Sequence, residues 1–250
     1  MGFLLLLPVL FGVCCAIQNL DIGHAHGNYV GDVTLYWQAC RPHDDGSATD
    51  SQIDVVMGLR QRLRGYMGVA TRTRTLQGAH HDTDLVLAWF DPLGAPHVDD
   101  MFSQSVLSGC AQYGTCTQLD TALGGRSDVE LLCGWQSAAR GTFIAWQRRG
   151  DTGDPFDSPW TAKSLDLMWA ATNVSLGSLA DVNSIAHLHC ADCSSPYYAQ
   201  CTRQCPLQGD TGYMERDRSL TIRLFGPLNK LPLCAAARAE FQALLCSDHV

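Results

Sequence analysis

The segment Thr83–Phe102, TDLVLAWFDPLGAPHVDDMF, constrains the fold more than any other part of the chain, because two strand-like apolar runs flank a tight turn. In the first run, Asp84 is followed by apolar residues at every position up to Phe90. A strand with two apolar faces is typical of the interior of a sheet that is covered on both sides. Asp91–Gly94, with the sequence DPLG, has the composition of a β-turn and predicts a hairpin.

Other segments with strand character are also short and separated by turns, which favours an all-β fold. The predicted strands are Val33–Gln38, Ile53–Leu59, Gly65–Ala70, Asp84–Phe90, His97–Phe102, Val129–Trp135, Thr142–Gln147, Leu165–Ala170 and Leu220–Leu224. Helical periodicity is confined to Ala235–Leu245, where an apolar face would contain Ala235, Ala236, Phe241, Leu244 and Leu245. We therefore predict an immunoglobulin-like antiparallel β-sandwich with a Cys-rich loop and a short C-terminal helix.

The first sixteen residues, MGFLLLLPVLFGVCCA, carry no charge and are almost entirely apolar. This composition predicts a signal peptide over residues 1–16 and therefore a secreted, extracellular protein. No later segment reaches about eighteen apolar residues, so we expect no transmembrane segment. The net charge is −8 and no basic run occurs, which argues against nucleic acid as a partner.

Two of the twelve cysteines lie in the predicted signal peptide, and an even number in the rest of an exported chain favours disulfide bonds. The ten candidates are Cys40, Cys110, Cys116, Cys133, Cys190, Cys193, Cys201, Cys205, Cys234 and Cys246. The four between Cys190 and Cys205 have spacings that also suit a zinc site, but in an exported chain we favour a disulfide-stapled loop. Cys234 and Cys246 would fasten the C-terminal helix, either to each other or back onto the sandwich. Asn173 begins a sequon for N-glycosylation.

Several short motifs occur in an order that resembles the DOMON domain. They are a Trp-bearing strand at Val33–Trp37, the Gly-aromatic-x-Gly element of Gly65–Val69, Asp84 at the start of the central strand, Asp99–Phe102, the strand and arginines of Thr142–Arg149, the LDLMWA signature of Leu165–Ala170, a histidine at 187 or 189, and the closing strand Ser219–Leu224. DOMON domains are secreted sandwiches that form the haem-binding cytochrome of cellobiose dehydrogenase and the N-terminal module of dopamine β-monooxygenase-like proteins.

The resemblance defines the expected domain organisation. The DOMON-like sandwich would occupy residues 28–226, with a Cys-rich insert at 190–212 that the family pattern lacks. A disulfide-clipped helical tail would follow at 227–250.

The resemblance also implies a cofactor. Haem-binding members have an axial methionine four residues before the Asp that opens the central strand, and a later histidine supplies the second axial ligand. Here that first position is His80, so His80 with His187 or His189 would form a bis-histidine site for haem b. Replacing a thioether by an imidazole is expected to lower the reduction potential. No Cys-x-x-Cys-His motif for covalent haem attachment occurs.

Other metals remain open from the same residues. His80-His81 and His187-x-His189 are ligand patterns that suit copper, and Asp82 or Asp84 near His80 would suit a hard cation. Asp84 is equally consistent with an ordinary residue at the start of a strand.

A redox-silent module that binds a carbohydrate or an extracellular protein is the main alternative. Tyr197, Tyr198 and Trp135 are the candidates for stacking on a sugar, with Trp160 as a further aromatic near a loop. Trp37, Trp89, Trp146 and Trp169 lie in strand patterns and are assigned to packing. No catalytic residues are predicted, because no Gly-x-Ser-x-Gly elbow or Ser/His/Asp set occurs. We therefore expect a ligand-binding or electron-transfer module and not an enzyme.

Overall fold

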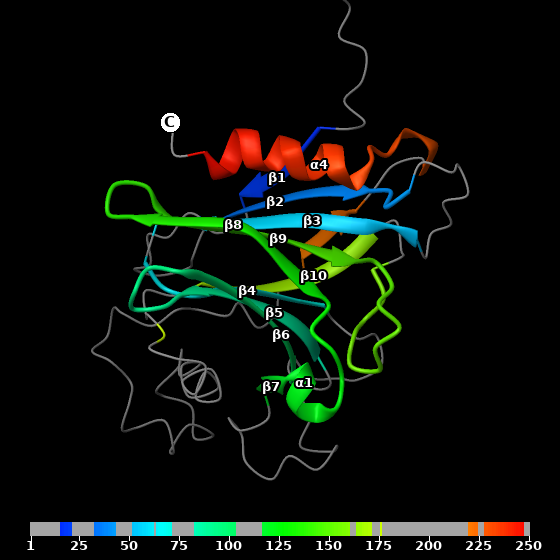
Figure 1. The fold of residues 1–250 in the computed structure, drawn as a ribbon, viewed down its shortest axis with the longest axis horizontal. Coiled ribbons are helices and arrows are strands. Elements are labelled where there is room, and N and C mark those ends of the chain that lie inside the picture. Colours follow the sequence, from blue (N-terminus) through cyan, green and yellow to red (C-terminus); the bar gives the residue numbers. More distant parts are fainter. Residues whose placement is uncertain are drawn as a thin grey trace, which may run out of the picture.

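The computed structural model describes residues 16–21, 33–43, 52–62, 64–71, 83–103, 117–160, 164–171, 176, 220–224 and 228–247. Two antiparallel sheets lie face to face (Figure 1). The first has the order β1 (Gln18–Asp21), β2 (Val33–Cys40), β3 (Asp54–Gln61), β9 (Gly141–Arg149) and β8 (Val129–Ser137). The second has the order β11 (Leu220–Arg223), β10 (Ser164–Ala171), β4 (Met67–Thr71), β5 (Thr83–Phe90), β6 (Pro96–Ser103) and β7 (Thr117–Leu119). The predicted β-sandwich is confirmed.

All nine predicted strands are present, and two short strands were missed. β1 pairs with β2 and lies before residue 28, where we expected the sandwich to start. β7 pairs with the end of β6 and runs directly into the single-turn helix α1 (Asp120–Leu123). Within the described residues, no helix is long and apolar enough to cross a membrane.

The central strand β5 is buried on both of its faces, as its composition predicted. Val86 and Ala88 belong to the main core between the two sheets, whereas Leu87 and Trp89 belong to a second cluster on the outer face that also contains Leu176. β5 is flanked by β4 and β6, so it is an interior strand. The double apolar pattern of this segment therefore follows from its position in the sheet.

The predicted turn between β5 and β6 is present at Asp91–Gly94. Gly94 has a φ of 85°, a left-handed conformation that glycine adopts without a steric penalty. One carboxylate oxygen of Asp91 accepts hydrogen bonds from the backbone N–H groups of Leu93 (2.9 Å) and Ala95 (2.8 Å). Asp91 thus fixes the turn and the register of the hairpin.

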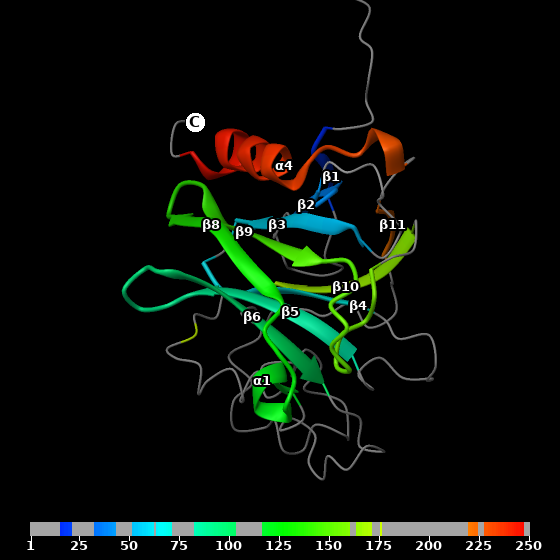
Figure 2. The same ribbon diagram turned by 45° about the vertical axis from the view of Figure 1, so that its right-hand side comes forward.

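The C-terminal helix α4 (Cys234–Phe241) lies across the outer face of the first sheet, on the side of the molecule opposite α1 (Figures 1 and 2). It continues into a π-helical turn, η6 (Gln242–Cys246). The buried residues of α4 are Cys234, Ala237 and Phe241. The apolar face predicted through Ala235, Ala236 and Leu244 was wrong: those three side chains are exposed.

Two disulfide bonds determine which face of the helix is buried. Cys40 in β2 is bonded to Cys234, and Cys133 in β8 is bonded to Cys246. Of the two alternatives for Cys234 and Cys246, attachment to the sandwich is therefore confirmed. The other predicted disulfide cysteines, Cys110, Cys116, Cys190, Cys193, Cys201 and Cys205, lie outside the described residues.

Candidate functional site

Charged side chains are buried at one end of the core, where β5 begins. The residues of one row across the second sheet mark this end, namely Leu220, Leu167, Thr71, Asp84, Phe102 and Gln118. Asp84 has the same orientation as Val86 and Ala88, so it projects into the space between the sheets. The sandwich therefore has a polar group where its apolar core ends.

The centre of this site is a buried ion pair between the two sheets. Arg148 of β9 contacts a carboxylate oxygen of Asp84 at 2.8 Å and one of Asp157 at 2.9 Å, and all three side chains are almost completely buried. The guanidinium also lies over the ring of Trp160, 4.6 Å from its centroid. The ion pair thus joins β5, β9 and the loop that follows β9.

Asp84 accepts two further hydrogen bonds at the same oxygen. The Ser158 backbone N–H donates to it at 2.8 Å, and the Thr71 hydroxyl lies 3.2 Å away. Burial raises the pKa of Asp84, while Arg148 acts in the opposite direction. With the guanidinium in contact, we take the ionised form as the one that the site is built to hold.

Two more aspartates lie next to the ion pair. Asp100 of β6 accepts a hydrogen bond from the Asp128 backbone N–H at 2.7 Å, and its other oxygen has no partner among the described residues. Asp120, the first residue of α1, is fully buried, and neither of its carboxylate oxygens has a hydrogen-bond partner there. Burial raises the pKa of Asp100 to about 7 and that of Asp120 to about 8, and for Asp120 the neighbouring carboxylates add to this rise.

Two loops close this end of the sandwich. Asp154, in the loop after β9, accepts hydrogen bonds from the backbone N–H groups of Arg126 (2.6 Å) and Phe156 (2.9 Å). Gly125 lies so close that a Cβ atom there would be 2.9 Å from the Asp154 carboxylate. A side chain at position 125 would therefore separate the loop of α1 from the loop after β9.

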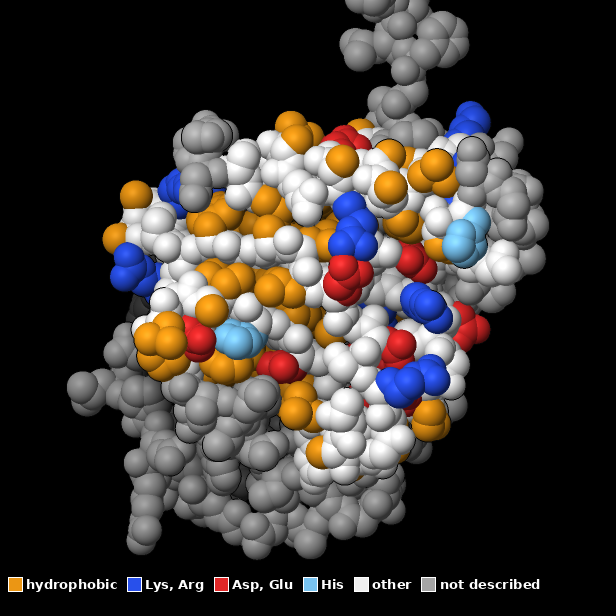
Figure 3. Space-filling model, viewed as in Figure 1, with side chains coloured by type: hydrophobic (Ala, Val, Ile, Leu, Met, Phe, Trp, Pro, Cys, Tyr) orange, Lys and Arg blue, Asp and Glu red, His pale blue; other side chains and the backbone are white. Residues whose placement is uncertain are grey.

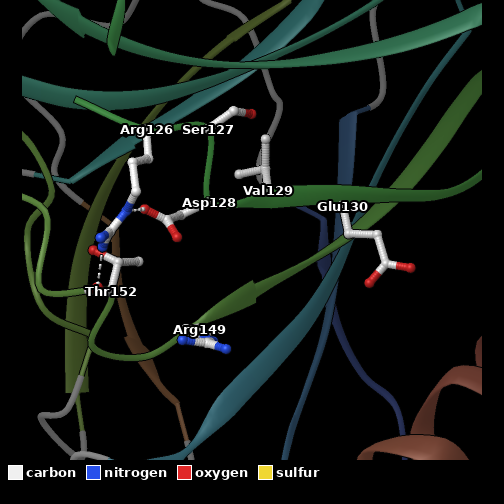
Figure 4. Close-up of a pocket in the computed structure, with 7 residues that line it drawn as sticks. All are labelled: Arg126, Ser127, Asp128, Val129, Glu130, Arg149 and Thr152. Atoms are coloured by element: carbon white, nitrogen blue, oxygen red, sulfur yellow. Dashed lines mark hydrogen bonds and ion pairs between the residues drawn. The ribbon is translucent and has the colours of Figure 1, made fainter. Parts of the chain in front are cut away.

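A shallow groove of about 570 Å³ opens on the surface beside the buried cluster. Its lining consists of Arg126, Ser127, Asp128, Val129, Glu130, Arg149 and Thr152. Arg126 points toward Asp128, at 3.7 Å, and donates to the backbone oxygen of Thr152 at 2.7 Å (Figure 4). Acidic and basic side chains gather over this end of the molecule (Figure 3).

Of the predicted site residues, Asp84 and Trp135 lie in the described part of the structure. Asp84, a candidate ligand for a hard cation, is the ion-pair partner of Arg148. Trp135 lies in β8, where its ring stacks on Phe143 and its indole N–H donates to the backbone oxygen of Leu245. The Arg140 guanidinium lies 4.5 Å from the centroid of the same ring. These contacts fit a role in packing beneath the C-terminal segment.

The remaining predicted site residues lie outside the described residues: His80, His81, Asp82, His187, His189, Tyr197, Tyr198 and Asn173. Among the other tryptophans, Trp37, Trp89 and Trp146 are buried, as predicted. Trp160 lies in the loop after β9, as predicted, but its side chain is 1% exposed beside Arg148 and is therefore not available for stacking on a sugar.

Sequence reasoning missed the association of Asp84 with Asp100, Asp157 and Arg148. Asp100 was part of a recognised motif, and Arg148 belonged to the arginines that end another. An apolar strand that ends in an arginine, together with an aspartate at the start of a facing strand, was the available signal. This signal identifies a pair only when the structure shows which residues of the two sheets face each other.

Comparison with known proteins gives a likeness to solved structures and none at the level of sequence families. No family model matches the chain, and no curated protein does. Among solved structures, the cytochrome domain of Myriococcum thermophilum cellobiose dehydrogenase matches with a TM-score of 0.38 and 13% sequence identity, over 62% of this chain and 68% of that one.

Proposed function

We propose that this chain is an exported, DOMON-like ligand-binding module that carries haem b and transfers electrons. The proposed axial ligands are His80 and either His187 or His189. The proposal rests on the order of the sequence motifs and on one observation about the second sheet, which concerns the row through Asp84.

Both histidine-bearing connections have a point of attachment in that row. The connection with His80 leaves the sheet after Thr71 and returns at Thr83, and Thr71 is paired with Asp84. The connection with His187 and His189 leaves the sheet after Ala171, which is paired with Met67 at the other end of β4. It returns at Leu220, which is paired with Leu167, the partner of Thr71. The two connections therefore share the row through Thr71 and Leu220 as a point of attachment. The proposal requires the longer connection to bring one of its histidines back to the end of the sheet where the connection with His80 begins.

The filled core favours a haem bound outside the space between the sheets. Large side chains such as Trp146, Met57 and Met67 are fully buried there. The haem would then lie against the end or the outer face of the sandwich. Two imidazoles would give six-coordinate iron with a lower reduction potential than a methionine–histidine pair.

Export is supported by the disulfide bonds. Cys40–Cys234 and Cys133–Cys246 join residues far apart in the sequence. Such crosslinks persist in oxidising compartments. Together with the apolar leader, they fit an extracellular protein.

The test is an absorption spectrum of the full chain secreted from a haem-replete eukaryotic host, recorded oxidised and after reduction with dithionite. We expect a Soret band that shifts on reduction and sharp α and β bands. His80→Ala should abolish the six-coordinate spectrum. His97→Ala is the control, because His97 stacks on Trp89 near the β5–β6 turn, at the opposite end of the sheet.

A wild-type protein that shows no haem bands and does not take up added haem would contradict the proposal. The redox-silent alternative would then be pursued with a glycan array and with variants Tyr197→Ala and Tyr198→Ala. A haem spectrum that His80→Ala leaves unchanged would exclude His80 as a ligand.

A further inference from the structure

If all of them are ionised, the buried aspartates at the end of the core carry more negative charge than the described residues balance. Arg148 contacts Asp84 and Asp157, the charge of Asp100 acts on the same guanidinium, and Asp120 lies beside these carboxylates. Fully ionised, the five groups carry three more negative than positive charges. A buried charge without a partner is costly in free energy, and proteins relieve that cost by pairing it or by coordinating a metal ion.

We propose that Asp84, Asp100 and Asp157 bind a divalent hard cation, that Asp120 supports the site from beside them, and that the cation is Ca²⁺. The site is independent of the haem proposal, since none of its ligands is a proposed haem ligand. The cation would lie between the two sheets, beside Arg148, and would hold β5, β6, α1 and the loop after β9 together.

The spacing of the carboxylates fits one coordination sphere. One oxygen each from Asp84, Asp100 and Asp157 lie within 4.8 Å of one another. Calcium binds oxygen ligands at about 2.3–2.6 Å, so two ligands on opposite sides of one ion are separated by up to about 5 Å. All three oxygens can therefore contact the same ion after small adjustments of the side chains.

Asp120 lies outside that group of three and is the second observation that points to a ligand. Its side chain is fully buried, and neither of its oxygens has a hydrogen-bond partner in the described structure. The charges that act on it most strongly are those of Asp100, then Asp157 and Asp84. Buried carboxylates are normally hydrogen-bonded, so a carboxylate left without any donor beside three others indicates a missing cation.

Arg148 does not satisfy this cluster alone. Its guanidinium contacts one oxygen of Asp84 and one of Asp157, and it is held on the ring of Trp160. Asp84 and Asp100 each keep an oxygen without a hydrogen-bond partner in the described residues. A cation on these oxygens would complement Arg148 without displacing it.

The ligand chemistry selects calcium. Within the described structure the group that could hold an ion contains only carboxylates, with no histidine or cysteine that would favour zinc or copper. Magnesium demands near-ideal octahedral geometry and keeps several waters, which a closed core does not readily accommodate. Calcium tolerates irregular arrangements of carboxylates.

The experiment uses the full secreted chain, stripped with EDTA and dialysed into chelated buffer at pH 7.5. Thermal unfolding is followed with CaCl₂ or with MgCl₂ at equal concentration, and calcium binding is measured by isothermal titration calorimetry. We expect calcium to raise the melting temperature in a saturable way, with one ion bound per chain and a much smaller rise with magnesium.

Asp120→Asn is the decisive variant, with Asp151→Asn as its matched control. Asp151 is exposed in the loop after β9, where its carboxylate accepts the Gly153 backbone N–H, a contact that asparagine retains. Asp120→Asn should weaken calcium binding at least tenfold while still unfolding cooperatively without metal, and Asp151→Asn should bind as wild type does. The proposal is overturned if the stripped wild type shows neither a thermal shift nor binding heat, if magnesium acts equally, or if Asp120→Asn binds calcium as tightly as wild type.

Discussion

The outer face of the first sheet and the end of the core beside Asp84 are both closed by elements distant in sequence, but by different forces. On the outer face, α4 packs Ala237 and Phe241 against β2, β3 and β9, and one disulfide bond from α4 and one from η6 join this segment to the sheet. At the end of the core, loops are held by buried carboxylates around Arg148. Apolar packing and covalent bonds do not respond to protons or ions in the neutral range, whereas buried carboxylates do. The molecule therefore has one closure that is insensitive to solution conditions and one that is sensitive to them.

The largest loss of stability is expected from removing the guanidinium of Arg148 at the end of the core. Arg148→Met should lower the free energy of unfolding by about 3–5 kcal/mol, because Asp84 and Asp157 would remain buried without their partner. Denaturant unfolding measures this change. The neighbouring Arg149→Met is the control, since Arg149 is exposed at the end of the same strand. Equal losses in the two variants would show that the ion pair contributes little.

Removing a disulfide bond from the outer face of the first sheet should lower the free energy of unfolding by slightly less. Cys133→Ser combined with Cys246→Ser removes a bond that joins residues 113 positions apart, and we expect a loss of about 2–5 kcal/mol. The same denaturant experiment, run at pH 5 and at pH 8, tests the contrast. The loss should be equal at both pH values. A loss confined to one of them would show that the closure of the outer face also depends on pH.

The pH dependence of the metal-free protein should come from the sensitive closure. The pKa of Asp120 is raised from 3.8 to about 8, so between these values the folded state binds more protons than the unfolded state, and stability falls as the pH rises. The groups that act on Asp120 are Asp100, Asp157, Asp84 and Asp154. In EDTA at pH 8, Asp120→Asn should be more stable than wild type by about 1–3 kcal/mol, because a neutral amide replaces an unsatisfied carboxylate. The two proteins should converge near pH 4, and a difference independent of pH would argue against this origin.

The smallest effect is expected from an ion pair on the insensitive side. Arg238 of α4 contacts Glu130 of β8 with both side chains partly exposed. Arg238→Ala should change the free energy of unfolding by less than about 1 kcal/mol, since solvent screens such pairs. Unfolding is compared in low salt and in about 0.5 M salt, a concentration that screens surface charges strongly. The difference in stability between variant and wild type should disappear at the higher concentration. A loss as large as that of Arg148→Met would remove the distinction between exposed and buried pairs.

The nine strands were predictable because each carries its own local pattern of apolar residues. β1, with the sequence QNLD, has no such pattern, and its strand conformation depends on pairing with β2. The buried face of α4 was also out of reach, because alanines occur at 235, 236, 237 and 239, and periodicity cannot rank them. The disulfides at Cys234 and Cys246 decide that face.

The acidic cluster could not be predicted for a different reason. Asp100 pairs with Val86 on a neighbouring strand, Arg148 comes from the facing sheet, and Asp120 lies in a segment that showed no strand or helix pattern. Local sequence carries no information about which of these charges share a buried volume. That information arises only from the packing of two sheets and two loops.

The bond between Cys40 and Cys234 closes a covalent ring that contains every strand from β3 to β11. A protease that cuts once within that ring leaves two fragments that remain joined through sulfur. On a gel without reductant the nicked chain would migrate as one species, and only reduction would release the pieces. A chain closed in this way keeps its parts together after a first cleavage.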